Sequence, residues 1–223
     1  MVPVRNVTAN LNKNVAGRGR FITLEGSEGV GKSTQAVRLA EALRASGKTV
    51  VLTREPGGTP GAEAIRALLM TGEAERWNAR AEALLFAAAR ADHVARVIRP
   101  ALDRGDWVVC DRYIDSTRAY QGGSNGLADE DIMALHSVGS DALLPDRTLL
   151  FEFSVAMGME RTYGRDLLSP DRMGSRDLSY YADVATRFRT FAQADDARFR
   201  IVDASGSVDE VAARVVAALD DLA

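Results

Sequence analysis

The stretch GSEGVGKST, residues 26–34, directly follows the apolar run FITLE and carries the residue types that bind phosphate. Gly26, Gly31, Lys32 and Ser33 occupy every fixed position of the pattern G-x-x-x-x-G-K-S/T, the P-loop. Glycines let backbone N–H groups turn toward phosphate oxygens, the lysine reaches the β- and γ-phosphates, and the hydroxyl faces Mg²⁺. A glycine turn with a chance lysine is the alternative, but a position between a predicted strand and a predicted helix favours nucleotide binding. The predicted nucleotide-binding residues are Gly26, Ser27, Glu28, Gly29, Val30, Gly31, Lys32, Ser33 and Thr34.

Two arginines directly follow other predicted strands, Arg54 in TREPGGTPG and Arg112 in CDRY. Open α/β sheets bind ligands at the carboxyl ends of their strands, so both side chains are expected to face the same crevice as the P-loop. Guanidinium groups bind phosphate through paired hydrogen bonds, and these two predict an acceptor phosphate opposite the nucleotide. The N-K-x-D signature of a guanine-specific switch does not occur on a late strand, and a motor usually has a larger body. The pattern therefore favours a kinase for a small acceptor.

Composition limits the classes of partner. The chain has 223 residues, a formal net charge of −3 and 46% hydrophobic residues, which fits one well-buried domain and argues against a nucleic-acid polymer as partner. No apolar run is long enough to predict a membrane span, and Cys110 is the single cysteine, so we expect a reducing, cytoplasmic setting. His93 and His136 lack metal-ligand spacing and are interpreted as structural.

Short apolar runs alternate with segments of helical periodicity, a pattern typical of an α/β fold with a parallel sheet. The longest helical segment runs from Asn78 to Arg104, and Pro100 is expected to bend or end its last turn. We expect residues 1–19 to be a flexible extension and residues 20–223 to form a single domain. Within that domain, residues 157–175, rich in arginine and glycine, are predicted to form a mobile lid. The five predicted strands are residues 20–25, 49–53, 106–110, 147–153 and 198–203.

Four blocks give the chain a resemblance to a known family: FITLEGSEGVGKST, TREPGGTPGAEAIR, LLFAAARADHV and DRYIDSTRAYQG. From about Arg20 to the C-terminus the sequence resembles thymidylate kinases, and the last block is far more specific than the P-loop. The resemblance implies the P-loop nucleoside monophosphate kinase fold, with helices on both faces of a five-stranded parallel sheet and a mobile lid. It also implies phosphorylation of dTMP to dTDP by ATP with Mg²⁺. A deoxynucleoside monophosphate kinase of broader base choice and a catalytically silent nucleotide-binding regulator remain the alternatives.

The resemblance also implies roles for individual residues. Glu28 would meet the 3′-hydroxyl of the acceptor sugar, and Tyr120 would crowd its 2′ position. Phe86 would stack on thymine, although an aromatic residue on an apolar helix stripe is ordinarily a core residue. Arg90, one turn further along the same helix face, would hydrogen-bond the carbonyl edge of the base. The implied substrate-binding set is Arg54, Glu55, Phe86, Arg90, Arg112, Ser116, Thr117, Tyr120 and Gln121, and the implied Mg²⁺ set is Ser33 and Asp111.

A cation for the transition state is expected from the lid, because Gly29 stands where some thymidylate kinases have an arginine. The lid offers Arg161, Arg165 and Arg172, of which Arg165, beside a glycine, is the favoured choice. The catalytic set is therefore Lys32, Arg112, Glu28, Arg165 and Arg161.

The chain departs from the family pattern at FEFSV and DRMG. The long helix is apolar on more than one face, which predicts a homodimer.

Overall fold

A parallel five-stranded sheet forms the centre of the computed structural model, which describes residues 18–73, 75–123, 126–152 and 178–222. The strand order is β2-β3-β1-β4-β5, so the P-loop strand lies in the middle with two strands on each side. All five strands predicted from the sequence are present, each within a residue or two of the predicted bounds. They are β1 Phe21–Gly26, β2 Val50–Arg54, β3 Trp107–Asp111, β4 Arg147–Glu152 and β5 Phe199–Asp203.

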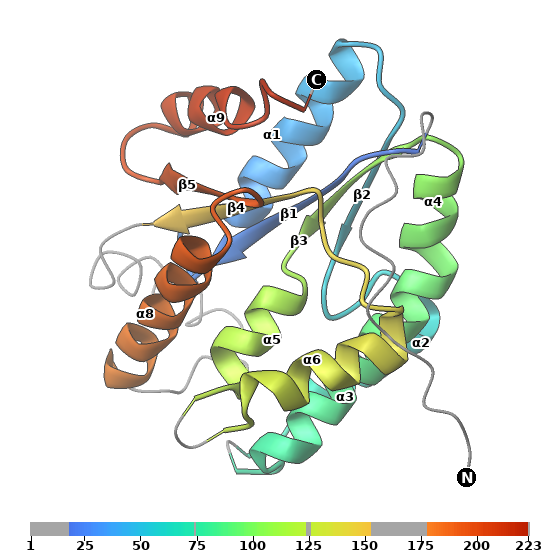
Figure 1. Cartoon of the computed structure of the whole chain (residues 1–223), viewed down its shortest axis with the longest axis vertical. Helices are drawn as coiled ribbons and strands as arrows, with labels where there is room; N and C mark the ends of the chain where they lie inside the picture. The colour runs from blue at the N-terminus through green and yellow to red at the C-terminus, as the bar shows by residue number, and fades with distance from the viewer. Residues whose placement is uncertain (1–17, 74, 124–125, 153–177, 223) are drawn as a thin grey trace, which may run out of the picture.

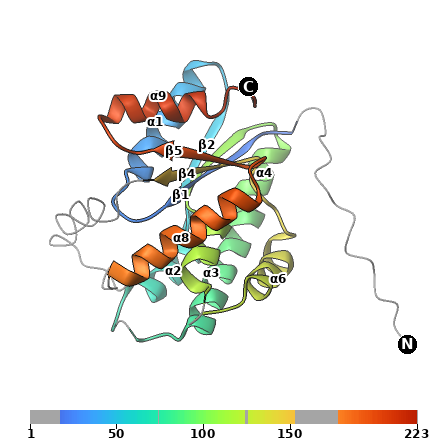
Figure 2. The same ribbon diagram turned by 60° about the vertical axis from the view of Figure 1, so that its left-hand side comes forward.

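Helices cover both faces of this sheet, as predicted (Figures 1 and 2). The helices α1 Lys32–Ala45 and α9 Val208–Ala217 pack together on one face, over a cluster that includes Ile22 and Leu149. The opposite face is covered by α5 Ile114–Gln121, by α8 Leu178–Ala194 and by the long rod described below. Burial on both faces explains why the central strands read as continuous apolar runs rather than alternating ones.

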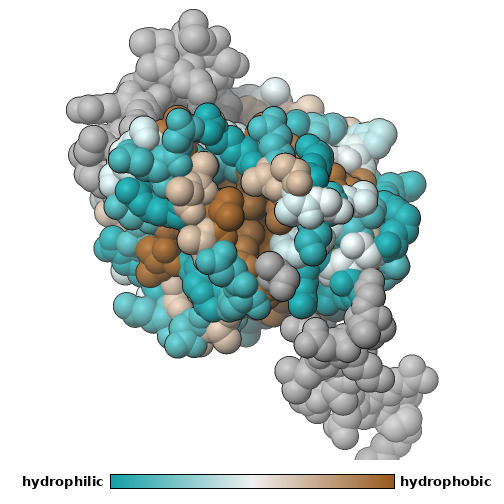
Figure 3. All heavy atoms as spheres, turned by 90° about the horizontal axis from the view of Figure 1, so that it is seen from above, coloured by the Kyte–Doolittle hydropathy of each residue, from teal (hydrophilic) through white to brown (hydrophobic). Residues whose placement is uncertain are grey.

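The apolar cluster beneath α1 and α9 is bordered by residues near the C-terminal ends of these two helices. Leu43, Ala218 and Leu222 are partly buried and pack against this cluster. Seen from above, hydrophobic side chains gather near the centre of a largely hydrophilic surface (Figure 3).

The predicted long helix is a rod of three parts: α3 Ala79–His93, a π-helical turn η1 Val94–Ile98, and α4 Arg99–Asp103. Asn78 caps its start, because the side chain accepts a hydrogen bond from the Ala81 backbone N–H at 2.9 Å. Pro100 lies in the last turn of the rod, which ends three residues later at Asp103, and the irregular turn η1 lies directly before it. Proline lacks the N–H that would bond one turn back, and the wider π turn next to it accommodates that loss.

Two further helices pack on this rod, α2 Pro60–Met70 and α6 Asp129–Ser140. The side chain of Thr59 caps α2 by accepting a hydrogen bond from the Ala62 backbone N–H at 3.0 Å. On the α6 side, a Cβ atom added to Gly139 would lie 3.4 Å from the Ala91 methyl group, so the two helices approach closely there. No helix in the described ranges has both the length and the apolar character to cross a membrane.

The carboxyl ends of three adjacent strands hold the P-loop and the two arginines predicted to bind phosphate, Arg54 and Arg112. In the parallel register, Leu24 lies opposite Asp111, and Asp111 lies opposite Arg54. The P-loop, the TREPGG segment and the CDRY segment therefore leave the sheet side by side. The predicted lid, residues 157–175, lies outside the described residues.

Candidate active site

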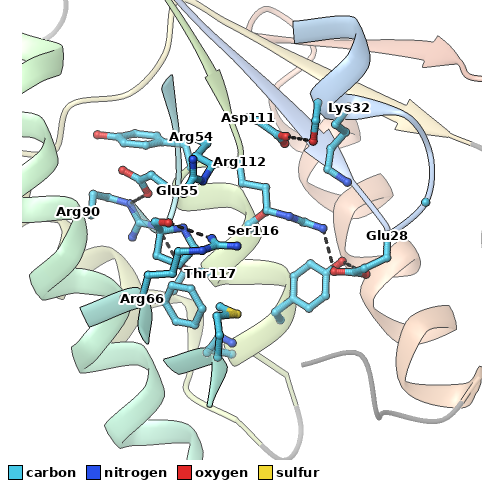
Figure 4. Close-up of a pocket in the computed structure, with 18 of the residues that line it drawn as sticks. Glu28, Lys32, Arg54, Glu55, Arg66, Arg90, Asp111, Arg112, Ser116 and Thr117 are labelled. Carbon is cyan, nitrogen blue, oxygen red and sulfur yellow. Dashed lines mark hydrogen bonds and ion pairs between the residues drawn. The ribbon is translucent and has the colours of Figure 1, made fainter. Parts of the chain in front are cut away.

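A cleft of about 520 Å³ opens at these strand ends, between the P-loop on one side and α2, α3 and α5 on the other (Figure 4). It brings together all the substrate-binding residues that the resemblance implied and most of the P-loop. Gly26, Ser27 and Val30 line a second hollow, of about 280 Å³, between the P-loop, β4 and α8. Arg161 and Arg165 fall outside the described residues. The predicted residues that line the first cleft are Glu28, Gly29, Gly31, Lys32, Ser33, Thr34, Arg54, Glu55, Phe86, Arg90, Asp111, Arg112, Ser116, Thr117, Tyr120 and Gln121.

The P-loop needs glycine where it turns into α1. Gly31 is the N-terminal cap residue of that helix with φ 89°, a left-handed conformation that costs glycine little. Lys32 folds back over the loop, and its Nζ donates hydrogen bonds to the carbonyl oxygens of Gly26 at 3.0 Å and Ser27 at 2.5 Å. Burial and the charge of Arg112 lower the pKa of Lys32 to about 8. The ammonium group is thus held at the mouth of a loop whose N–H groups suit an anion.

Ser33 and Asp111 form a pair of oxygen donors beside this loop. Ser33 Oγ donates a hydrogen bond to Asp111 Oδ2 at 2.5 Å. Asp111 Oδ1 is buried and has no hydrogen-bond partner among the described residues, which leaves a carboxylate oxygen available to a ligand. Hydroxyl and carboxylate oxygens are the donors that Mg²⁺ prefers, usually together with phosphate oxygens and water. These two residues fit a nucleotide-bound Mg²⁺.

Arg112 links the two halves of the cleft. Its guanidinium donates hydrogen bonds to the Gly26 carbonyl oxygen (3.1 Å), to Ser116 Oγ (3.0 Å) and to Glu28 Oε1 (2.8 Å). Tyr120 donates its hydroxyl hydrogen to the other oxygen of Glu28 at 2.6 Å. Burial opposes ionisation of Glu28, but the charges of Arg112 and Lys32 outweigh it and lower its pKa. A cation and a carboxylate therefore face the centre of the cleft together.

The far end of the cleft is a pocket floored by α3. Arg90 is only 3% exposed, and its guanidinium donates to Glu55 Oε2 at 2.8 Å and to Thr117 Oγ1 at 2.9 Å. The ring of His93 lies 3.0 Å from the second oxygen of Glu55, which fixes that carboxylate from both sides. Phe86 lies one helical turn before Arg90 and lines the cleft while half-buried. A flat apolar ring next to an oriented guanidinium suits a nucleobase.

Arg54 lies at the edge of the cleft rather than at its centre. Its Nη2 bonds both carboxylate oxygens of Glu63 on α2, at 3.0 and 3.1 Å, and the side chain is about half exposed. Glu63 also accepts a hydrogen bond from the Gly58 backbone N–H at 3.0 Å. Arg54 is thus placed by the helix that follows it in the chain.

Comparison with known proteins agrees with this geometry. The family model described as thymidylate kinase matches residues 24–215. The chain belongs to this family. It is 60% identical over 204 residues to the thymidylate kinase of Rhizorhabdus wittichii, covering 92% of this chain and 98% of that one. It is 48% identical over 206 residues to the thymidylate kinase of Bordetella petrii, covering 92% and 97%.

A solved structure gives the same result for the fold. The crystal structure of thymidylate kinase from Ehrlichia chaffeensis matches with a TM-score of 0.73 at 30% identity, over 91% of this chain and 100% of that one. The family and the fold predicted from the sequence are thereby confirmed.

Sequence reasoning missed several residues of the site in this thymidylate kinase family member, Pro56 and Tyr113 among them. Arg66 and Met70, four apart on α2, line the cleft, and Arg66 Nη1 donates to the Pro56 carbonyl oxygen at 3.0 Å. Their spacing on one helix face, directly after the TREPGG segment, was the signal that could have found them. Glu25, at the end of β1, lies behind the cleft and bonds Ser116 and the Tyr113 backbone. A single acidic residue in an apolar strand gives no indication of which groups it will meet.

Proposed function

We propose that this cleft is where the chain phosphorylates dTMP with ATP, with the two nucleotides meeting at Arg112. The observation that carries the proposal is that one cleft joins the P-loop to a second pocket lined by Arg112, Phe86 and Arg90. A P-loop ATPase has no need for the second pocket. A kinase for a nucleoside monophosphate needs both, at strand ends that face one another.

At the donor end, Lys32 and the backbone N–H groups of the P-loop would hold the ATP phosphates. Ser33 and Asp111 would hold Mg²⁺, the former directly and the latter directly or through water. When bound, the ion would neutralise charge that develops between the β- and γ-phosphates. The unpartnered Oδ1 of Asp111 supports this assignment.

At the acceptor end, Arg112 would keep its hydrogen bond to Ser116 and turn its other N–H groups toward the phosphate of dTMP, with Arg54 assisting from the edge of the cleft. Glu28 would accept a hydrogen bond from the sugar 3′-hydroxyl, because its carboxylate already stands between Arg112 and Tyr120. Tyr120 would occupy the space that a 2′-hydroxyl needs. Phe86 would stack on thymine, and Arg90, held by Glu55, would donate to the carbonyl edge of the base.

Phosphoryl transfer has a loose transition state, so alignment and electrostatic stabilisation account for most of the catalysis and no covalent enzyme intermediate is required. Arg112 would hold the attacking oxygen in line by touching both the acceptor and the transferred group. Arg165 of the lid, with Arg161 as the alternative, would supply the additional cation. Both residues lie in residues 157–175, outside the described part of the chain.

A homodimer is part of the proposal. Leu84 on α3 is 55% exposed and Val138 on α6 is 87% exposed, and these helices cross closely at Gly139. An apolar face shared by two adjacent helices is suited to a two-fold interface in which the same patch is used by both copies. The nucleotide substrates and the unpaired thiol of Cys110 support a cytoplasmic location.

Turnover of a panel of nucleoside monophosphates with ATP and Mg²⁺ tests the function. We expect dTMP to be used at least about tenfold better, in kcat/KM, than dCMP or dGMP, since stacking alone does not discriminate between bases but an oriented guanidinium does. Comparable use of dCMP and dGMP would point instead to a kinase of broad base choice. ATP binding without turnover of any acceptor would point to a regulator that has lost catalysis.

A further inference from the structure

Glu25 is a buried carboxyl group directly behind the acceptor pocket. It is the residue before the P-loop glycine Gly26, and its exposed fraction is 0%. One oxygen accepts a hydrogen bond from the Tyr113 backbone N–H at 2.8 Å, and the other accepts one from Ser116 Oγ at 2.5 Å. Both partners belong to the segment that carries Arg112.

These two hydrogen bonds fix the start of α5. Tyr113 is the N-terminal cap residue of that helix but offers no side-chain cap of its own, so Glu25 supplies an acceptor from the neighbouring strand. Ser116 in turn accepts a hydrogen bond from Arg112. Arg112 has φ 67°, a left-handed conformation that is strained for a residue with a Cβ atom and persists only where its surroundings hold it. A continuous chain of contacts therefore runs from Glu25 through Ser116 to the guanidinium at the centre of the cleft.

The charges around Glu25 are opposed. Asp115, on the first turn of α5, disfavours a second negative charge, whereas Arg112 from the β3–α5 junction and Lys32 from α1 favour it. Burial raises the pKa of the Cys110 thiol on β3, so this group stays neutral. Burial is the largest effect and, together with Asp115, raises the pKa of Glu25 to about 7. Small changes of charge in the cleft will therefore move this carboxyl group between its two forms near neutral pH.

We propose that Glu25 is a proton-linked positioning residue: it holds Ser116 and Arg112, and it takes up a proton from solvent when the acceptor phosphate binds at Arg112. This inference rests on the proposed function, which places that phosphate at Arg112. A phosphate dianion cancels the positive charge that keeps Glu25 ionised, so the neutral carboxyl becomes the more stable form. The protonated group can donate to Ser116 Oγ and still accept from the Tyr113 N–H. Uptake of the proton therefore preserves both contacts while removing a negative charge from behind the bound phosphate.

Calorimetric titration of the protein with dTMP, in two buffers of different ionisation enthalpy, measures the protons taken up on binding. At about pH 7.5 the wild-type protein is expected to take up at least about half a proton more than Glu25→Gln, whose amide copies the neutral carboxyl. The titration of dTMP itself is common to both proteins and cancels. Asp106→Asn, a change of another buried acid at the opposite end of β3, is the matched control and should keep the wild-type proton number. Equal proton numbers for wild type and Glu25→Gln would overturn the inference.

A measurement on the wild-type protein alone guards against failure of the variant to fold. Above about pH 7 the phosphate of dTMP is almost fully ionised, so proton uptake by Glu25 should make the affinity for dTMP fall as the pH rises, by up to about tenfold per pH unit. This fall should begin near the pKa of Glu25, about 7, before loss of the Lys32 proton, with a pKa of about 8, adds to it. Affinity that stays constant between about pH 7 and pH 9 would contradict proton uptake. If the wild-type protein neither binds nor phosphorylates dTMP, the proposed function itself fails, which is a different result.

Discussion

Replacing Phe86 by alanine isolates the base-binding half of the cleft. Phe86 is half-buried, lines the cleft and is not a member of the three hydrophobic clusters that the described residues form. Removing it should therefore cost much less than the 3 to 5 kcal/mol typical of truncating a core phenylalanine. Stacking on an aromatic side chain is worth about 1 to 3 kcal/mol per base. Since about 1.4 kcal/mol corresponds to a factor of ten, kcat/KM for dTMP should fall about tenfold to a hundredfold.

The assay is steady-state turnover with dTMP varied at saturating ATP and then with ATP varied at saturating dTMP. The loss should appear in the KM for dTMP, with the KM for ATP nearly unchanged, because Phe86 lies on the acceptor side of Arg112. Phe191→Ala is the matched control: this ring on α8 packs on a buried cluster that includes Phe188 and Phe199 and does not line the cleft, so its loss should lower the melting temperature without changing KM for dTMP. Unchanged kcat/KM for dTMP together with a large loss of stability in Phe86→Ala would return Phe86 to a core role and refute the assignment.

Three other changes test separate parts of the molecule. Arg165→Ala should lower kcat by about 10³-fold or more with dTMP affinity nearly unchanged. A large loss at Arg161 or Arg172 instead would move the role, and no loss at any of the three would remove it. Val138→Glu puts a charge on the proposed two-fold face and should give a monomer in sedimentation, while a wild-type monomer at micromolar concentration would remove the dimer. Burial lowers the pKa of His136 to about 4, so the unfolded state binds its proton first as the pH falls. Its stabilising effect is fully present above about pH 6.5 and is lost toward pH 4, on the order of 3 kcal/mol; His136→Asn should flatten this slope in denaturant unfolding, and an unchanged slope would contradict it.

Much of the fold could be predicted because its signals are local. Each strand is a short apolar run, with β1, β3 and β4 buried on both faces, and the P-loop is a set of residues at fixed spacing within nine positions. The side chains of Asn78 and Thr59 cap helices by accepting hydrogen bonds from backbone N–H groups only three residues further along the chain. The predicted convergence of the P-loop, Arg54 and Arg112 also needed no coordinates, because parallel strands end at one edge of the sheet.

Packing between distant segments decided the rest. Glu25 and Ser116 are separated by 91 positions, and only the adjacency of β1 and β3 brings them to 2.5 Å. Arg54 is held at the edge of the cleft by Glu63, and the π turn before Pro100 follows from how one long helix accommodates a missing N–H. Sequence periodicity states which face of an element is buried, but not which polar groups will share that interior. The pKa of a buried group depends on its burial and on every charge within a few ångströms of it. The effects that set the pKa of Glu25 are therefore present only in the folded molecule.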